Sequence, residues 1–142
     1  MYATIDDLQK RLSRFYAELY ADAAGNPDAS LMTEDLTAAT AEIDGSVAAR
    51  YQTPVTAADA LPLLKSWCLT LVEEIAWSRS GRDELPENVV ARAKTVREQL
   101  KRVGEGAFRL PAAPAETTSG QGGAAILSIA EPVFTREKMS GF

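Results

Sequence analysis

The chain is most hydrophobic over LPLLKSWCLTLVEEIAW, residues 61–77. Apolar residues recur along this run at intervals of three and four, the period of an α-helix, and form the stripe Leu61, Leu64, Cys68, Leu71 and Ile75. Other apolar residues, Trp67 and Trp77 among them, leave almost no polar face, and a helix that is apolar nearly all round is buried. The sequence therefore predicts a helix here, ended by Gly81, at the centre of an all-α core.

Three more segments have the alternation of an amphipathic helix, at about residues 5–23, 33–51 and 87–103. The first follows a capping box formed by Thr4 and Asp7, and it can break near Ser13. The second takes Thr33 as its N-cap. Gly45 lies inside the second segment, where glycine costs about 1 kcal/mol, so we expect a neighbouring helix to pack closely against it. The pattern predicts a bundle of four or five helices over residues 1–110.

The composition changes after this helical body. Residues 111–123, PAAPAETTSGQGG, are rich in proline, alanine, glycine and threonine and are expected to form a flexible linker. Residues 124–142 regain apolar character and are expected to form a docking arm. The arm contains one short strand-like run at 124–130, and a lone strand beside a helical body needs the sheet edge of another chain.

The arm and the end of the second helix supply the predicted partner-binding residues. In the arm these are the apolar side chains of the strand-like run and of the terminal segment, together with one arginine; the full set is Ile126, Leu127, Ile129, Phe134, Arg136, Met139, Phe142, Arg50 and Tyr51. Two interpretations of Arg50 and Tyr51 stay open. They either pack and cap a helix end within the chain, or they meet a partner subunit, since both residue types are common in interface hot spots.

Composition excludes several classes of function. The 142 residues suggest one domain, and they contain no histidine, which removes histidine-based catalysis and histidine-ligated metals. The single cysteine, Cys68, is expected to be a buried small hydrophobe, because a nucleophilic role lacks a histidine base. Glu42 and Asp44 are two residues apart and do not face each other on a helix. We expect no enzymatic activity, no cofactor and no metal.

Charge and hydropathy limit the classes of partner that the chain is expected to bind. The net charge of −5 leaves no overall basic footprint for nucleic acid. A basic set lies on the last helix, at Arg92, Lys94, Arg97, Lys101 and Arg102. Glutamates interrupt it, so we interpret it as a solvated, salt-bridged face; a regulatory or nucleic-acid-binding module using residues 92–102 is the alternative function. No apolar run approaches the ~20 residues of a membrane span, and residues 1–7 lack a signal-peptide pattern, so we expect no membrane association and synthesis in the cytoplasm.

Several stretches together resemble a known family. They are MYATIDDL (1–8), AEIDG (41–45) with AARY (48–51) and Pro54, the hydrophobic helix from Pro62 to Trp77, and FTREKMSGF (134–142). In this order and spacing they look like a small neck protein of Mu-like phages and prophages. The resemblance covers nearly the whole chain.

The resemblance implies a head–tail connector, similar to the helical adaptors of long-tailed phages. Such proteins form a ring, typically twelve-fold, beneath the portal and continue the DNA channel toward the tail. The implied partners are other copies of the chain, the portal protein through the C-terminal arm, and a tail-side neck or tail terminator protein. DNA would pass without specific binding. The implied location is the virion neck, with the host cytoplasm during assembly.

Overall fold

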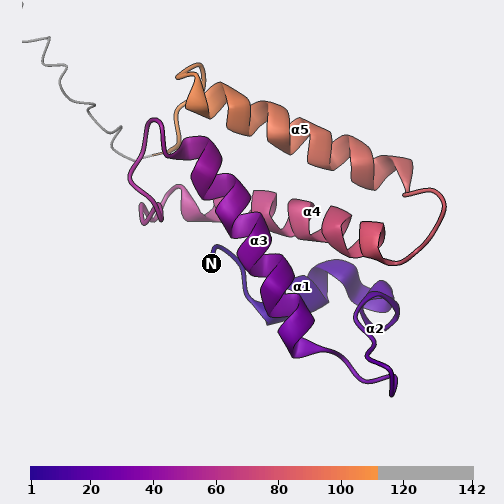
Figure 1. The fold of residues 1–142 in the computed structure, drawn as a ribbon. Coiled ribbons are helices and arrows are strands. Elements are labelled where there is room, and N and C mark those ends of the chain that lie inside the picture. The colour runs from indigo at the N-terminus through magenta and orange to yellow at the C-terminus, as the bar shows by residue number, and fades with distance from the viewer. Residues whose placement is uncertain (112–142) are drawn as a thin grey trace, which may run out of the picture.

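A computed structural model describes residues 1–111 of the chain, and these residues form an all-α bundle (Figure 1). The elements in chain order are α1 (Ile5–Leu12), a 3-10 turn η1 (Ser13–Phe15), α2 (Tyr16–Leu19), α3 (Ala29–Val47), α4 (Leu61–Arg79) and α5 (Glu87–Gly104). The predicted fold class is confirmed. Residues 1–111 contain no strand beyond an isolated bridge between Ala21 and Pro27, and the predicted strand at 124–130 falls outside the described residues.

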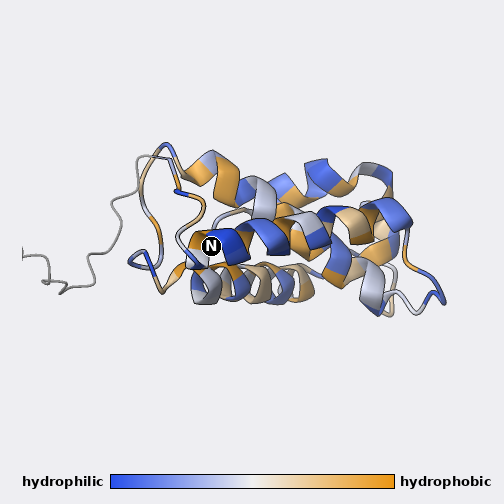
Figure 2. Cartoon of the chain, turned by 90° about the horizontal axis from the view of Figure 1, so that it is seen from above, coloured by the Kyte–Doolittle hydropathy of each residue, from blue (hydrophilic) through white to orange (hydrophobic). Residues whose placement is uncertain are grey.

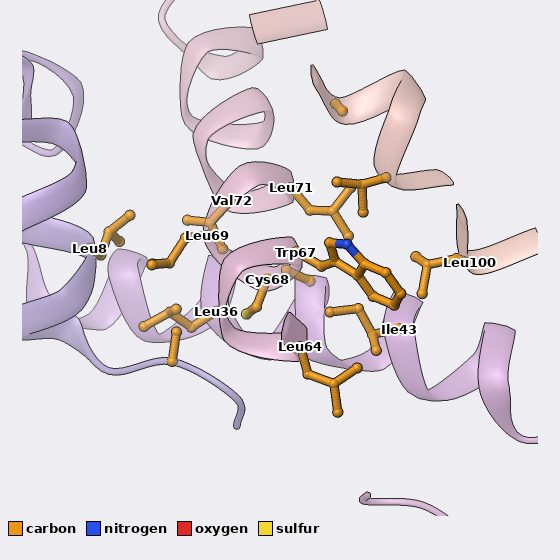
Figure 3. Packing of buried hydrophobic residues seen from close by; sticks show 14 of the residues in the cluster. Leu8, Leu36, Ile43, Leu64, Trp67, Cys68, Leu69, Leu71, Val72 and Leu100 are labelled. Carbon is orange, nitrogen blue, oxygen red and sulfur yellow. The ribbon is translucent and has the colours of Figure 1, made fainter. Parts of the chain in front are cut away.

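Helix α4 occupies the centre of the core, as its sequence predicts. It contacts α3, α5 and the N-terminal helices, and Trp67, Cys68 and Leu71 are all buried. Figure 3 shows side chains of α4 meeting Leu8, Leu36 and Leu100 from the surrounding helices. Pro62 lies in its first turn, and Gly81, the predicted stop, follows the helix with φ 74°. In Figure 2 polar and apolar positions interleave along the helices, as amphipathic packing requires.

Each of the long helices runs opposite to the next one along the chain. Asp35 near the start of α3 binds Arg79 at the end of α4, and Glu73 late in α4 binds Arg92 early in α5. One end of the bundle therefore holds the end of α3, the start of α4 and the end of α5. The opposite end holds the loops 20–28 and 80–86. Figure 1 shows this arrangement.

The N-terminal segment begins and breaks where the sequence indicates, but it is shorter than expected. Thr4 and Asp7 form the predicted capping box. The break falls at Ser13, whose φ of 48° lies in the left-handed region that is uncommon for residues other than glycine. Helical structure ends at Leu19 rather than near residue 23. The break turns α2 so that Tyr20 and Leu19 reach the core.

Helix α3 starts earlier than predicted, and Thr33 is not its N-cap. The helix begins at Ala29, because the Asp28 carboxylate accepts hydrogen bonds from the backbone N–H groups of Ser30 and Leu31, both at 3.0 Å. Asp28 thus satisfies the free donors of the first turn one full turn before Thr33. Thr33 lies inside the helix, and its hydroxyl donates to the Ala29 carbonyl. The early start adds buried Met32 to the core.

The expectation of close packing at Gly45 is wrong, and Gly104 has that role instead. A Cβ at Gly45 would meet no atom within 4 Å, whereas a Cβ at Gly104 would lie 2.8 Å from the Ser46 backbone oxygen. The contact between α3 and α5 therefore depends on the glycine in α5. Sequence patterning could not assign it, because the partner atom lies 58 positions away in the chain.

The two glycines give a matched pair of substitutions. We expect Gly45→Ala to raise the free energy of unfolding by about 0.5–1 kcal/mol, since alanine is the better helix former. Gly104→Ala should lower it by about 1–3 kcal/mol, because the added methyl group forces α3 and α5 apart. Urea unfolding of both variants measures the difference. Equal effects of the two substitutions would contradict the close approach at Gly104.

Two hydrogen-bond networks, one buried and one partly buried, link distant parts of the chain. The Tyr20 hydroxyl donates to Asp35 at 2.6 Å, and Arg79 donates to both oxygens of the same carboxylate at 2.8 and 2.9 Å. The Tyr2 hydroxyl donates to Asp44 and accepts from the backbone N–H of Val55. Burial, followed by the hydrogen bond to the neighbouring carboxylate, raises the pKa of both Tyr2 and Tyr20.

These two tyrosines predict an alkaline loss of stability. Below about pH 10, the ordinary tyrosine pKa, both rings are neutral whether the chain is folded or unfolded, so their full contribution is present. Above that pH the unfolded chain ionises while the folded chain keeps its protons, and each tyrosine removes up to about 1.4 kcal/mol per pH unit. Urea unfolding between pH 8 and 11.5 measures the decline. A Tyr2→Phe variant should show a shallower decline, and an unchanged slope would contradict this origin.

Candidate partner-binding surface at the root of the C-terminal arm

The end of α5 is built to stop the helix and turn the chain back onto the body. Gly106 has φ 81°, a conformation that favours glycine. The backbone N–H groups of Ala107 and Phe108 both donate to the Arg102 carbonyl, at 2.8 and 3.1 Å, which satisfies a free carbonyl of the last turn. The chain beyond Gly106 therefore leaves α5 in a fixed direction.

Two residues then fasten this turn to the core. The Phe108 ring lies 6.2 Å from the Trp67 ring, between centroids, and Leu110 is buried. The backbone N–H of Leu110 donates to the Tyr51 hydroxyl at 3.0 Å. Phe108 and Leu110 therefore fold back onto the body. We call residues 106–111 the arm root, because the predicted linker and arm continue from Pro111.

Tyr51 is used within the chain. Its side chain is buried, with 4% of its surface exposed, and its hydroxyl holds the arm root. A direct partner contact through Tyr51 would require this part of the core to open. Of its two interpretations, intramolecular packing is the one that the structure shows.

Arg50 also contacts the residues at the arm root, and its side chain remains exposed to solvent. Its guanidinium donates to the carbonyl oxygens of Gly104 at 3.4 Å and Glu105 at 3.3 Å. The expected capping role is present, but Arg50 caps α5 rather than its own helix. The guanidinium also lies against Gly106, where an added Cβ would approach it to 3.1 Å. Arg50 and Tyr51 thus define where the arm begins.

The other predicted partner-binding residues are Ile126, Leu127, Ile129, Phe134, Arg136, Met139 and Phe142, and they lie outside the described residues. What the structure adds is their point of attachment. They follow a root that is tied to the turn after α3, to α4 and to the end of α5, at one end of the bundle.

The basic residues of α5 are largely engaged in ion pairs with α3 and α4. Arg97 binds Glu42 at 2.7 Å and Glu74 at 2.6 Å, and Arg92 binds Glu73 at 3.1 Å. The two glutamates, Glu74 first and then Glu42, raise the pKa of Arg97. The predicted salt-bridged face is confirmed at these positions. Within residues 1–111, Lys94 and Arg102 have no ion pair of this kind.

The remaining candidates for chemistry have structural partners. Glu42 binds Arg97, and Asp44 accepts the Tyr2 hydroxyl, so the two carboxylates do not converge. Cys68 is buried, as predicted, and burial raises the pKa of its thiol. Among residues 1–111 there is no group of three or more His, Cys, Asp or Glu side chains placed to hold a metal ion. Over the same residues, no helix combines the length and apolar character that a membrane crossing requires.

Sequence reasoning missed the Asp35 site and the arm-root role of Tyr51. Nothing in the sequence pattern assigns Asp35 a buried role, yet it is 5% exposed and bound by Arg79 and Tyr20. The one signal in the sequence was its place beside the apolar stripe of α3, one residue before Leu36. Its partners lie 15 and 44 positions away, beyond any local pattern.

Comparison with known proteins agrees with the resemblance read from the sequence. A family model described as Bacteriophage Mu, Gp36 matches residues 2–128. The chain is also 30% identical over 146 residues to gene product J of Escherichia phage Mu, and this match covers 99% of the chain and 98% of the phage protein. The family match includes the helical body, the arm root and the predicted linker. The chain therefore belongs to the Bacteriophage Mu Gp36 family and is a protein of the Mu-like phage type.

Proposed function

We propose that this protein is a structural component of the virion, the head–tail connector that forms a ring between portal and tail. The observation that carries the proposal is the division between a bundle and an arm with a fixed origin. Tyr51, Trp67 and Arg50 hold the arm root at one end of the bundle, and 31 residues follow Pro111. A folded body with a long terminal segment suits a subunit whose body packs against neighbouring copies and whose terminal segment binds a different protein.

In this proposal the body builds the ring and the arm binds the portal protein. From Pro111 to Phe142 is 32 residues, which span at most ~105–115 Å when fully extended. Copies in a closed ring contact each other head to tail through two different surfaces. The resemblance implies twelve copies, and many arms docking together add avidity without a large interface for each copy.

The other partners follow from the position of the ring. The face away from the portal meets a tail-side neck or tail terminator protein. DNA passes through the channel without specific binding, which the net charge of −5 favours. The protein is located in the virion neck, after assembly in the host cytoplasm.

The test is a deletion of residues 124–142 in a Mu-like phage. We expect the truncated protein to keep its helical circular dichroism, because the described core ends at Leu110, while portal-containing heads fail to acquire tails. Thr117→Ala in the linker is the matched control and should complete particles normally. If the truncated protein yields infectious particles at the level of the full chain, the arm does not fasten the connector.

The alternative function is a regulatory or nucleic-acid-binding module that uses α5. In this alternative, Lys94 and Arg102 would contact the nucleic acid. The neighbouring Arg92 and Arg97 are already paired with glutamates, so little unpaired positive charge remains on this face of α5. Affinity for duplex DNA, measured against salt concentration, separates the two functions. Binding tighter than about 1 μM with a steep salt dependence would favour the module.

A further inference from the structure

An apolar groove lies between the N-terminal segment and the start of α4. It has a volume of about 400 Å³ and is lined by Met1, Tyr2, Ala58, Leu61, Pro62 and Lys65. Met1 and Leu61 are 66% and 39% exposed, and within residues 1–111 the only other exposed large hydrophobic residue is Val90 on α5. Two of these three side chains thus meet in one groove. We call it the α4-start groove.

Two residues of the groove wall, Tyr2 and Lys65, are held in place by the body. The Tyr2 hydroxyl is fixed between Asp44 and the backbone of Val55. Lys65 binds Asp7 at 2.6 Å, and this hydrogen bond, with those from Thr4, lowers the pKa of Asp7 to about 2. The charge of Lys65 is therefore balanced within the chain. A groove whose walls are already ordered loses little entropy when it binds an apolar segment.

The α4-start groove and the arm root lie at the same end of the bundle. Leu61 begins α4, and Trp67, less than two turns further on, contacts Phe108 in the arm root. Figure 1 shows the start of α4, the loop before it and the end of the described chain at one end of the molecule. In a closed ring every copy presents this end in the same direction. Each arm root is then level with the groove of the next copy.

We propose that the α4-start groove binds residues 126–129 in the arm of the adjacent copy, an inference that rests on the proposed ring. The chemistry of the two surfaces matches. Residues 117–130 contain no charged side chain, and Ile126, Leu127 and Ile129 are the large apolar residues within them. An apolar, uncharged segment fits a groove lined mostly by apolar residues, in which Lys65 is already paired with Asp7. The arm residues Phe134, Met139 and Phe142 are left for the portal.

The length of the linker lets the arm reach the adjacent copy more easily than any copy beyond it. From Pro111 to Ile126 is 16 residues, which reach at most ~53–58 Å. A bundle two or three helices wide, with axes 8–10 Å apart, spans about 20–30 Å. The linker therefore crosses one subunit with slack, whereas two subunits would require it to be almost fully extended. The first part of the arm would bind the neighbouring subunit, and the rest would continue to the portal.

Disulfide trapping between two versions of the full chain tests the contact. One version carries Leu61→Cys, the other carries Leu127→Cys and a tag that changes its mass, and both are expressed together during phage assembly. We expect a disulfide between tagged and untagged copies in purified particles. Val90→Cys replaces Leu61→Cys in the control and should give less than a tenth of that yield. The native Cys68 is buried and does not compete.

A third version carrying both Leu61→Cys and Leu127→Cys distinguishes the occupants of the groove. A disulfide only within one chain would show that the arm folds back on its own body, which overturns the proposal. Particles that contain the protein but form no disulfide also overturn it, and the proposed function survives. Particles that lack the protein altogether contradict the connector function itself.

A second variant measures the contribution of the groove without covalent trapping. Leu61→Asp places an acid in the first turn of α4, where helix dipoles favour negative charge, so the body should fold normally by circular dichroism. We expect at least about tenfold less protein in particles, the effect of losing one buried leucine contact. Val90→Asp should stay within twofold of the unchanged chain. Equal incorporation of the two variants would overturn the proposal.

Discussion

Replacing Trp67 with alanine should lower the free energy of unfolding by about 3–5 kcal/mol, the usual cost of removing a large buried aromatic side chain. Trp67 is only 3% exposed and lies in the centre of the core beside Leu64, Ile43 and Leu100 (Figure 3). It also supports the Phe108 ring of the arm root. The substitution should therefore weaken the bundle and release residues 106–111 together. Urea unfolding measures the first effect, and proteolysis after Arg109 measures the second.

Phe108→Ala is the matched control for Trp67. Phe108 is only partly buried, so its loss should cost about 1–2 kcal/mol, less than for a fully buried ring. The bundle should then stay folded while cleavage after Arg109 becomes faster. If Phe108→Ala destabilises the chain as much as Trp67→Ala, the arm root is part of the folding core rather than an attachment to it.

Replacing Arg79 with methionine should lower the free energy of unfolding by about 2–3 kcal/mol. The substitution leaves the Asp35 carboxylate, 5% exposed, with the Tyr20 hydroxyl as its remaining donor. Removing one partner of a fully buried pair costs about 3–5 kcal/mol. The Arg79 side chain is 33% exposed, and solvent screening reduces that figure. Thermal and urea unfolding at pH 7 measure the change.

Two further variants identify the cause. Arg82→Met removes an arginine whose partner, Glu18, has a side chain that is 52% exposed, and it should cost less than about 1 kcal/mol. Adding Asp35→Asn to Arg79→Met removes the unpaired charge and should recover part of the lost stability. If the double variant is no more stable than Arg79→Met alone, the cost comes from lost packing of the arginine stem rather than from an unpaired carboxylate.

The elements that the sequence predicted well are those whose signals are local. The apolar run of α4, the Thr4–Asp7 capping box, the break at Ser13 and the stop at Gly81 each depend on residues within a few positions of one another. The first residue of α3 was predicted less well. The sequence predicted Thr33 as the N-cap of α3, whereas the helix begins after Asp28, whose carboxylate reaches two backbone donors.

The candidate site was predictable only in outline. Composition separated a helical body from a linker and arm near residue 110, but it did not show how residues 106–111 attach to the body. The role of Tyr51 in holding Leu110 was not evident, because the two residues are 59 positions apart. The α4-start groove was equally hidden, since its walls come from the N-terminus, the loop before α4 and α4 itself.

The sequence by itself determined the all-α class, the central place of α4 and the family of the protein. Helical periodicity, turn residues and family motifs are all recognised within short stretches of consecutive residues. Tertiary structure alone decided which glycine admits a close helix contact, which carboxylate is buried, where the arm is fastened and where an apolar groove remains. Those properties depend on atoms from segments that meet only after folding: Gly104 against Ser46, Asp35 against Arg79, and Tyr51 against Leu110. Each of these contacts joins residues that are far apart in the chain, so a local sequence pattern cannot predict it.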